Sequence, residues 1–232
     1  TNRSLWPTIR ARIYDSAEEG NTIDGGRSFW FREHGADLSL SLNVIHKTTP
    51  SVVRTSYRIG SRYRKFKRLE KEHPVITERD QSVGVFGEMM FSRMPDSAPR
   101  DMVSGWGQTV MLSHEEGLSD FGGELPGYNT LVYVNQAIPS LIKHQGFELG
   151  AIHQNQYGDI SYDRNMCIPR GYRDGETAGG LNLRKNLMFS LEYHFPLWFA
   201  DRGLGVNLFH INLLKGSFFV DYGAGWDTSF NF

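Results

Sequence analysis

The sequence predicts an all-β protein built mainly from antiparallel strands, and three observations lead to this prediction. Glycine accounts for 25 of the 232 residues and aromatic residues for 13%, a combination typical of strands joined by tight turns. Apolar and polar residues alternate with a period of two along several segments. At about 25 residues for each strand and its connection, the chain has room for roughly eight to ten strands.

The composition indicates a folded chain and excludes several function classes. With 39% hydrophobic and 22% charged residues the sequence is too apolar to be disordered, and we expect one domain over residues 1–232. Its 25 basic and 26 acidic residues give a net charge of −1, so it has no general attraction to nucleic acid or anionic lipid. The single cysteine, Cys167, cannot form an internal disulfide or provide a cysteine pair for zinc, redox or iron–sulfur chemistry.

The sequence contains no apolar run of about 18 residues, the length that a membrane-spanning helix needs. The sequence does not exclude membrane-spanning strands, because about 9–11 residues of alternating character suffice for one strand of a barrel. The chain begins Thr1-Asn2-Arg3, with neither a methionine nor a signal-peptide pattern. We therefore expect it to be a piece of a longer protein.

Three segments in the first half of the chain alternate and are predicted as strands: 37–44, where the pattern is clearest, 53–64, and 82–91, where it is weaker. In the first, one face carries Leu38, Leu40, Leu42 and Val44, and the other carries Asp37, Ser39, Ser41 and Asn43. In the second, one face carries Val53, Thr55, Tyr57, Ile59 and Tyr63, and the other carries Arg54, Ser56, Arg58, Arg62 and Arg64. Four arginines therefore share one strand face.

Further strands are predicted at 102–113, 130–138, 145–156, 184–197, 204–215 and 216–226. Turn-rich segments separate the strands at 18–26, 95–100, 115–128, 157–180 and 199–203. The 157–180 connection is the longest, and a connection of this length in a compact β domain suggests a functional loop. Alternation alone is compatible with a sandwich, a soluble barrel and a membrane barrel, because it does not say which face meets solvent.

Several motifs resemble binding or catalytic sites, but each lacks a defining feature or has a plainer explanation. The basic run Arg54–Lys71, with its interleaved aromatic residues, could line a nucleic-acid groove, but a strand ending in a solvated charged loop, which could also meet lipid phosphates, explains it better. His114-Glu115-Glu116 lacks the second histidine of a zinc helix. The acids of the long loop, Asp159, Asp163, Asp174 and Glu176, lack the spacing of a calcium loop. Because neither metal pattern is complete, no metal or other cofactor is expected. No serine lies in a GxSxG elbow, so an enzyme is not expected.

Three motifs in the last third of the chain resemble one known family. They are Pro169-Arg170-Gly171-Tyr172, the strand Phe189-Ser190-Leu191-Glu192-Tyr193-His194-Phe195-Pro196-Leu197, and the strand Gly216-Ser217-Phe218-Phe219-Val220-Asp221-Tyr222-Gly223-Ala224-Gly225-Trp226-Asp227. Their order and spacing resemble the bacterial surface antigen family, the BamA-like superfamily of outer-membrane assembly and translocation barrels. The resemblance covers residues 166–228. Upstream, Leu5-Trp6-Pro7-Thr8 and Gly35-Ala36-Asp37 look like barrel segments that follow TolB-type propellers in some related proteins.

This resemblance implies an antiparallel transmembrane β-barrel, or part of one, of outer-membrane type, with the 157–180 loop folded back into its lumen. It further implies a location in a bacterial-type outer membrane and a role in inserting or translocating other proteins. The partners implied are outer-membrane lipid, client outer-membrane or secreted proteins, and a fused or associated periplasmic domain, with no nucleic acid.

The residue pattern supports one detail of the resemblance. Alternation along 189–195 and 217–223 places Glu192 and Asp221 on the polar face of their strands. In the family, the loop arginine docks against such inward carboxylates, which implies that Arg170 of the Arg170-Gly171-Tyr172 motif meets Glu192 and Asp221 here. A planar guanidinium suits this role because it can donate to two acceptors at once. The alternative is that Arg170 is a solvated loop residue and the two acids only line a channel.

The sequence also departs from the family. Family members have further strands after the one that matches 216–226, whereas this chain stops at Phe232, and no periplasmic POTRA-like βααββ pattern is present. Two other functions therefore stay open. One is a barrel that anchors or exports a fused N-terminal, propeller-like domain, and the other is a soluble β-rich binding domain.

Overall fold

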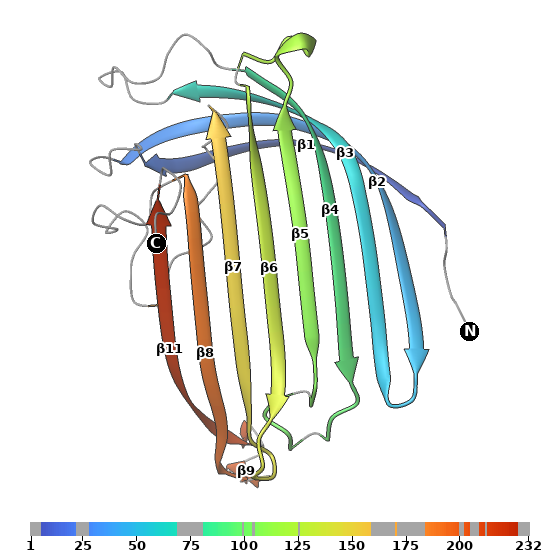
Figure 1. Ribbon diagram of the computed structural model, residues 1–232, viewed down its shortest axis with the longest axis vertical. Helices are drawn as coiled ribbons and strands as arrows, with labels where there is room; N and C mark the ends of the chain where they lie inside the picture. The colour runs from blue at the N-terminus through green and yellow to red at the C-terminus, as the bar shows by residue number, and fades with distance from the viewer. Residues whose placement is uncertain are drawn as a thin grey trace.

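The chain forms one large curled sheet (Figure 1). The computed structural model describes residues 6–21, 28–68, 81–98, 100–103, 105–124, 126–158, 170, 184–199, 202–204, 209–211 and 213–226. The strands of the sheet are β1 (Thr8–Asn21), β2 (Ser28–Thr48), β3 (Ser51–Arg68), β4 (Gln81–Pro95), β5 (Gln108–Gly117), β6 (Gly127–Pro139), β7 (Gly146–Gly158), β8 (Lys185–Trp198) and β11 (Leu214–Trp226). A short 3-10 helix, η1 (Ser119–Phe121), lies between β5 and β6.

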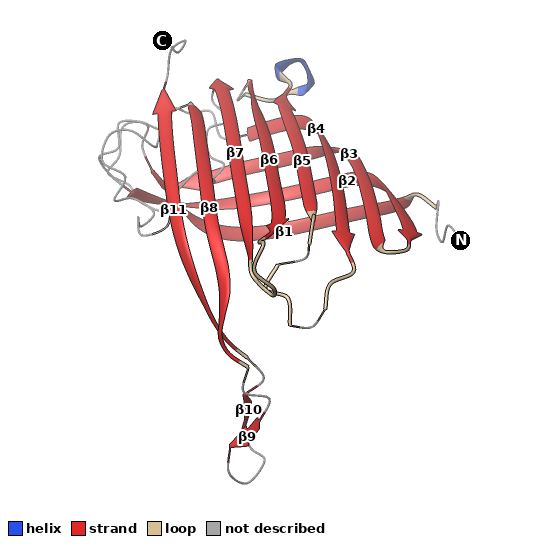
Figure 2. Ribbon diagram, turned by 60° about the horizontal axis from the view of Figure 1, so that its bottom comes forward, coloured by secondary structure: helices blue, strands red, loops and turns tan. Residues whose placement is uncertain are grey.

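The strands follow one another in the sheet in the order β1-β2-β3-β4-β5-β6-β7-β8-β11, and every neighbouring pair is antiparallel. The sheet bends so that β1 to β3 pass behind β5 to β8, and β1 and β11 form its two edges (Figures 1 and 2). Two short strands, β9 (Arg202–Leu204) and β10 (Phe209–Ile211), pair with each other in the β8–β11 connection and project beyond the sheet. The predicted all-β, antiparallel partial barrel is therefore confirmed.

Within the described part of the chain, no helix is both long and apolar enough to cross a membrane.

Directly opposed residues on neighbouring strands have their side chains on the same face of the sheet. On each face, such residues form rows that cross the strands. One such row runs through Ile9, Leu40 and Ile59, and these three side chains are exposed. They lie on the convex, outer face. The adjacent residues of β2 and β3, such as Asp37, Ser39 and Arg64, point to the concave, inner face and are buried.

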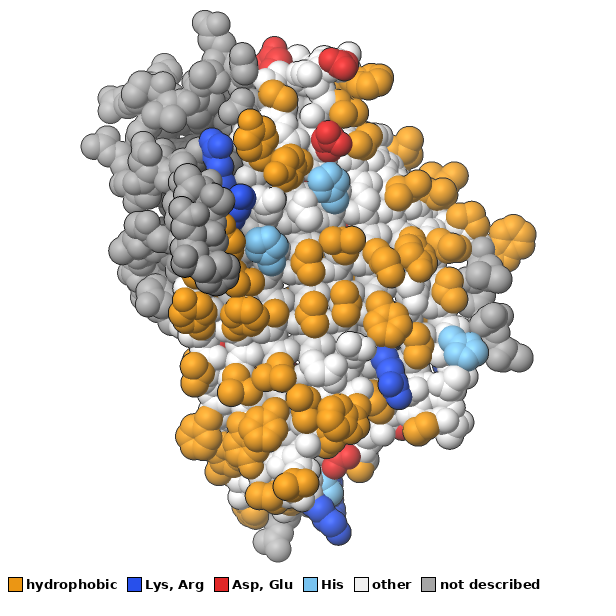
Figure 3. All heavy atoms as spheres, in the orientation of Figure 1, with side chains coloured by type: hydrophobic (Ala, Val, Ile, Leu, Met, Phe, Trp, Pro, Cys, Tyr) orange, Lys and Arg blue, Asp and Glu red, His pale blue; other side chains and the backbone are white. Residues whose placement is uncertain are grey.

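The two faces have inverted polarity compared with a water-soluble protein. The buried polar and charged residues of the described chain are Glu33, Asp37, Ser39, Ser51, Arg64, Ser82, Ser92, Glu115, Gln154, Gln156 and Asn186, whereas its buried hydrophobic residues are Phe86, Val103, Leu131 and Ala137. Large hydrophobic side chains are instead exposed on β1, β2, β3, β4, β8 and β11. Figure 3 shows hydrophobic side chains spread over the viewed face of the sheet, with few charged groups among them.

Some strand boundaries differ from the sequence prediction. The predicted strand 102–113 is wrong at its start, because Gly105 has a left-handed backbone conformation and β5 begins only at Gln108. The predicted strand 204–215 is interrupted, since its described parts belong to β9, β10 and the start of β11. β1 was not predicted, and its end extends into the 18–26 segment that was expected to be turn. β7 reaches Gly158, so the first two residues of the predicted 157–180 loop belong to β7, and of the others only residue 170 lies within the described residues.

Candidate functional site

The inner faces of β8 and β11 form the first polar cluster. Asp221 of β11 lies directly opposite Ser190 of β8, and Phe219 lies opposite Glu192. Antiparallel pairing brings side chains at opposed positions within about 5 Å of each other. Because 190, 192, 219 and 221 all have inner-face parity, two carboxylates, a hydroxyl and an aromatic ring meet on one patch of wall.

Arg170 binds this patch with all three guanidinium nitrogens. Its Nε donates to Asp221 Oδ2 at 2.8 Å, Nη2 donates to Asp221 Oδ1 at 2.9 Å, and Nη1 donates to Glu192 Oε2 at 2.6 Å. Nη2 also donates to Ser190 Oγ at 3.0 Å, and the backbone N–H of Arg170 donates to Asp221 Oδ2 at 3.0 Å. The guanidinium carbon lies 3.9 Å from the ring centroid of Phe219, a cation–π distance.

The arrangement is a two-pronged Arg–Asp pair with a second carboxylate at its side. The side chain of Asp221 is 4% exposed and that of Glu192 20%, whereas Arg170 keeps 40% of its side chain exposed. Hydrogen bonds to Asp221 and then to Glu192 raise the pKa of the Arg170 guanidinium further above its ordinary value. The cluster holds the chain at residue 170 against a wall that is 20 to 51 residues away in sequence.

The structure thus brings together Arg170, Glu192 and Asp221, the three charged residues singled out in the sequence. Gly171 and Tyr172, the rest of that motif, lie outside the described residues. Sequence reasoning missed Ser190 and Phe219 as contacts of Arg170. Alternation along the two strands could have identified them, because both residues point to the same face as the two acids.

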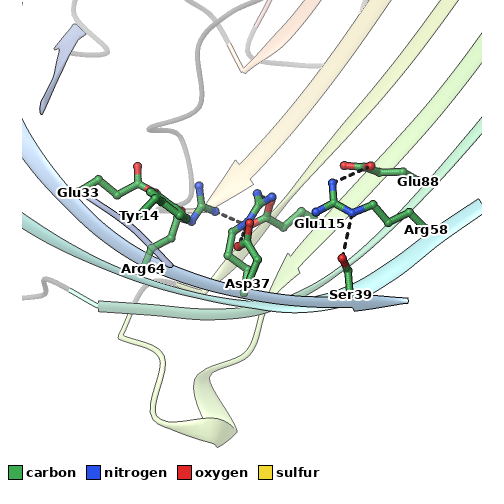
Figure 4. Close-up of polar contacts among 9 residues, drawn as sticks. Tyr14, Glu33, Asp37, Ser39, Arg58, Arg64, Glu88 and Glu115 are labelled. Atoms are coloured by element: carbon green, nitrogen blue, oxygen red, sulfur yellow. Dashed lines mark hydrogen bonds and ion pairs between the residues drawn. The ribbon is translucent and has the colours of Figure 1, made fainter. Parts of the chain in front are cut away.

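A second polar cluster lies on the inner face of β1 to β5 (Figure 4). Arg62 donates from Nε to Asp37 at 2.9 Å and from Nη1 to Glu115 at 2.7 Å, and Arg64 also donates to Glu115. Farther along β3, Arg58 contacts Ser39 at 3.2 Å and Glu88 at 3.3 Å. These contacts join β2, β3, β4 and β5 through side chains as well as through the sheet ladder.

Two small residues make this second cluster possible. Gly84 lies opposite Arg62 on β4 and opposite Gly117 on β5, so the row of Arg62 has no side chain on either strand, and Glu115 lies opposite Phe86 in the neighbouring row. Gly60 lies opposite Phe86, whose ring covers it: a Cβ at Gly60 would lie 2.8 Å from Phe86 Cζ. The same ring receives Arg58 and Arg62, each with its guanidinium carbon 4.9 Å from the centroid.

The arginines that the sequence placed on one face of a strand belong to this second cluster. Arg58, Arg62 and Arg64 point into the concave side and bind acidic or hydroxyl groups there. Glu115, which sequence reasoning set aside as part of His114-Glu115-Glu116, binds Arg62 and Arg64, whereas its neighbour His114 contacts Thr130 through Nδ1 at 2.7 Å. Alternation along β5 could have separated these two residues.

The described residues contain no group of three or more His, Cys, Asp or Glu side chains placed to hold a metal ion. The contacts of the two clusters are hydrogen bonds and ion pairs, and such contacts hold segments of chain together. Compared with models of known protein families and with curated proteins, the chain finds no match in either set.

Proposed function

We propose that this chain is part of the wall of an outer-membrane β-barrel of the BamA-like surface antigen type, which assists the insertion or translocation of other proteins. The inverted polarity of the sheet carries this proposal. In a barrel of this type the outer face meets lipid and the inner face lines a wet lumen, so charged side chains belong inside and large hydrophobic ones outside. An isolated soluble domain with the same strands would need a second layer over its outer face.

The height of the apolar outer band supports the proposal. On β3 the outer positions from Val53 to Tyr63 carry no charge, and the next outer position is the exposed Lys65. Ten residue steps cover about 33 Å along a strand. At a tilt of about 40° this corresponds to about 25 Å across a membrane, the height of the apolar band of outer-membrane barrels.

Aromatic side chains mark both ends of the band. At one end of the outer face, the rings of Phe147, Tyr193, Phe195 and Phe218 follow one another across β7, β8 and β11 with centroids 4.8 to 5.8 Å apart. At the other end, Tyr128 stacks on Tyr157 at 5.7 Å. Phe147 and Tyr157 lie ten residues apart on β7, so the two aromatic levels are again separated by about 25 Å for a tilt of about 40°.

The Arg170 cluster supports the more specific role. Arg170 is held on the inner faces of β8 and β11 by a two-pronged ion pair, which is how the family that the sequence resembles arranges its arginine motif. In this role the protein performs no covalent chemistry. It provides a lipid-facing wall and a positioned loop beside which a client chain can fold.

A reconstituted folding assay tests the proposal. The purified protein is placed in phospholipid vesicles, an unfolded outer-membrane barrel protein is added, and its folding is followed by the heat-dependent shift of its gel mobility. We expect faster client folding than in empty vesicles, and a severalfold loss of this acceleration for Arg170→Ala. Arg93→Ala, at an exposed arginine of the outer face of β4, is the matched control and keeps the acceleration. A wild-type protein that inserts into vesicles but leaves the client rate unchanged contradicts the proposed role.

A further inference from the structure

The turn between β6 and β7, residues 140–145, is held in one shape by its own hydrogen bonds. Ser140 N–H donates to Gln145 O at 3.0 Å, and Gln145 N–H donates to Ile142 O at 3.3 Å. The hydroxyl of Ser140 accepts the N–H of Ile142 at 3.2 Å. His144 takes a left-handed backbone conformation with φ of 65°. The turn therefore has a defined backbone conformation that its own hydrogen bonds stabilise.

The β4–β5 connection supports this turn from the side. His144 Nδ1 lies 2.8 Å from Asp101 Oδ1, and Met102 N–H donates to His144 O at 3.2 Å. Val103 is buried against Gly146, where a Cβ would lie 2.9 Å from its side chain. On the other side the ring of Phe199 meets His144 edge-on at 5.7 Å. Three connections are thus packed together at this end of the sheet.

Despite this support, the tip of the turn presents its largest hydrophobic side chains outward. Leu141 is 106% exposed and Ile142 is 59% exposed, and the exposed Lys143 follows them. A turn in water more commonly carries small or polar residues at its tip. We call Leu141 and Ile142 the apolar turn.

The apolar turn continues the apolar outer face on this side of the sheet. On β8 the outer face stays hydrophobic down to the strand end, where Leu197 is 59% exposed, and Leu214 at the start of β11 is 51% exposed. On β2 and β4 the corresponding end carries the exposed polar side chains His46 and Arg93. The hydroxyl of Tyr193, in the aromatic level of the outer face, donates to Gln145 within the turn. The hydrophobic surface therefore extends past the strands at β6 to β11 and reaches the turn.

We propose that the apolar turn is a membrane anchor, inserted into the interfacial layer of the phospholipid bilayer with Lys143 at the level of the lipid phosphates. This inference rests on the proposed membrane function and adds a second contact with the bilayer beyond the strands. Leucine and isoleucine enter the boundary between headgroups and acyl chains favourably, and a neighbouring lysine is attracted to anionic phosphate. The turn is already held rigid, so little conformational freedom is lost on insertion.

Spin-label accessibility in vesicles tests this anchor. Single cysteines are introduced in a Cys167→Ser background at Leu141, at Leu191 on the outer face of β8, and at Asp120 in the exposed helix η1. Each is labelled with a nitroxide, and the protein is reconstituted in vesicles of zwitterionic lipid with one quarter anionic phosphatidylglycerol. The ratio of collisions with oxygen to collisions with a water-soluble nickel chelate reports depth in the membrane.

We expect the highest ratio at residue 191, the lowest at residue 120, and a ratio at residue 141 severalfold above that at residue 120. A ratio at residue 141 equal to that at residue 120, with residue 191 in lipid, overturns the anchor and makes the turn a docking point for a partner from the aqueous phase. A ratio at residue 191 equal to that at residue 120 overturns the proposed membrane function itself. The two failures are therefore distinguishable.

Discussion

Arg170 uses more of its donors than an ordinary loop arginine does. Three guanidinium nitrogens and the backbone N–H are hydrogen-bonded, and the ring of Phe219 covers the guanidinium face. Lysine has a charge of the same sign but no planar fork, so it can replace only part of this geometry. The contact should therefore depend on shape as much as on charge.

We predict that Arg170→Ala destabilises the docked segment by an amount between the about 1 kcal/mol of an exposed ion pair and the about 3–5 kcal/mol of a buried pair that loses one partner. Arg170→Lys should recover less than half of that loss. Limited digestion with proteinase K measures it, as the rate of cleavage within residues 159–184. Cleavage of Arg170→Ala at the wild-type rate, with Arg93→Ala also unchanged, contradicts a clamp at this residue.

Asp101 gives the end of the sheet a dependence on pH. The hydrogen bond from His144, opposed in part by desolvation and aided by the N–H of Ala98, lowers the pKa of the Asp101 carboxyl below its ordinary value. A carboxyl with a lowered pKa in the folded state contributes stability above the pKa of the unfolded chain, and that stability is lost as pH falls through the lower, folded value. Acid should therefore weaken the contact between the β4–β5 connection and the β6–β7 turn.

We predict that backbone amides of 140–145 become less protected from hydrogen exchange, after correction for the intrinsic pH dependence, as pH falls below about 4, the ordinary range of an aspartate. In Asp101→Asn this acid-dependent step should be absent, because the amide side chain does not titrate. An equal loss of protection in both proteins assigns the step to another group.

At the scale of single strands, the two faces of β8 should tolerate charge differently. Leu191 lies on the outer face and is 44% exposed, whereas Met188 has inner-face parity and lies opposite Gly223 of β11. A lysine near the middle of the lipid-facing band costs about 2–4 kcal/mol, while one that faces a wet lumen keeps its water.

We predict that Leu191→Lys lowers the free energy of unfolding in lipid by about 2–4 kcal/mol and that Met188→Lys lowers it by much less. Both changes replace an apolar side chain with lysine on one strand, so they differ mainly in the face they test. Ser190 is avoided as a control because it contacts Arg170. Denaturant titration in vesicles gives both values, and equal losses would be evidence against lipid on the outer face.

The glycines of β3 and β4 allow a similar comparison for packing. A Cβ at Gly60 would lie 2.4 Å from the backbone oxygen of Leu38 and 2.8 Å from the Phe86 ring, whereas a Cβ at Gly87 would have nothing within 4 Å. We predict that Gly60→Val destabilises the protein by about 1–3 kcal/mol or more through overpacking, and that Gly87→Val is tolerated. Thermal unfolding in detergent distinguishes them, and a tolerated Gly60→Val would disprove close packing of Phe86 on β3.

The strands also show how far sequence patterns reach. Alternation predicted β2, β3, β4, β6, β7, β8 and β11 because successive residues of a strand point to opposite faces and the two faces of this sheet differ in polarity, most clearly in β2, β3 and β8. β1 was not predicted, because its alternating pattern is short: its outer face carries only Ile9, Ala11 and Ile13 before Asp15, the first charged residue on that face. The 204–215 segment was predicted as one strand, but its described hydrophobic residues are divided among β9, β10 and β11.

Side-chain contacts between distant strands could be predicted only in part from the sequence. Parity placed Glu192 and Asp221 on one face, but it could not reveal which strands become neighbours. Glu115 and Arg62, 53 residues apart, meet diagonally across β4, where Gly84 lies opposite Arg62 and Phe86 lies opposite Glu115. Such a contact depends on three strands at once, so no local pattern contains it.

At the scale of the whole molecule, the polarity of the two faces predicts its behaviour in solution. Large hydrophobic side chains are exposed on the outer face of neighbouring strand after strand, whereas a soluble monomer exposes them mostly as isolated residues or small patches. We predict that the protein leaves its native membrane only with detergent and then gives a β-type circular dichroism spectrum. Monodisperse protein that refolds in plain buffer would contradict membrane residence.

The two edges of the sheet have a consequence for strand direction. Because nine strands alternate in direction, β1 and β11 run the same way, so pairing them directly would create a parallel ladder in an otherwise antiparallel sheet. A strand that pairs with both edges must run opposite to both. Bacterial single-chain outer-membrane barrels have an even number of antiparallel strands. An all-antiparallel closure therefore requires an odd number of strands in addition to these nine, whatever their source.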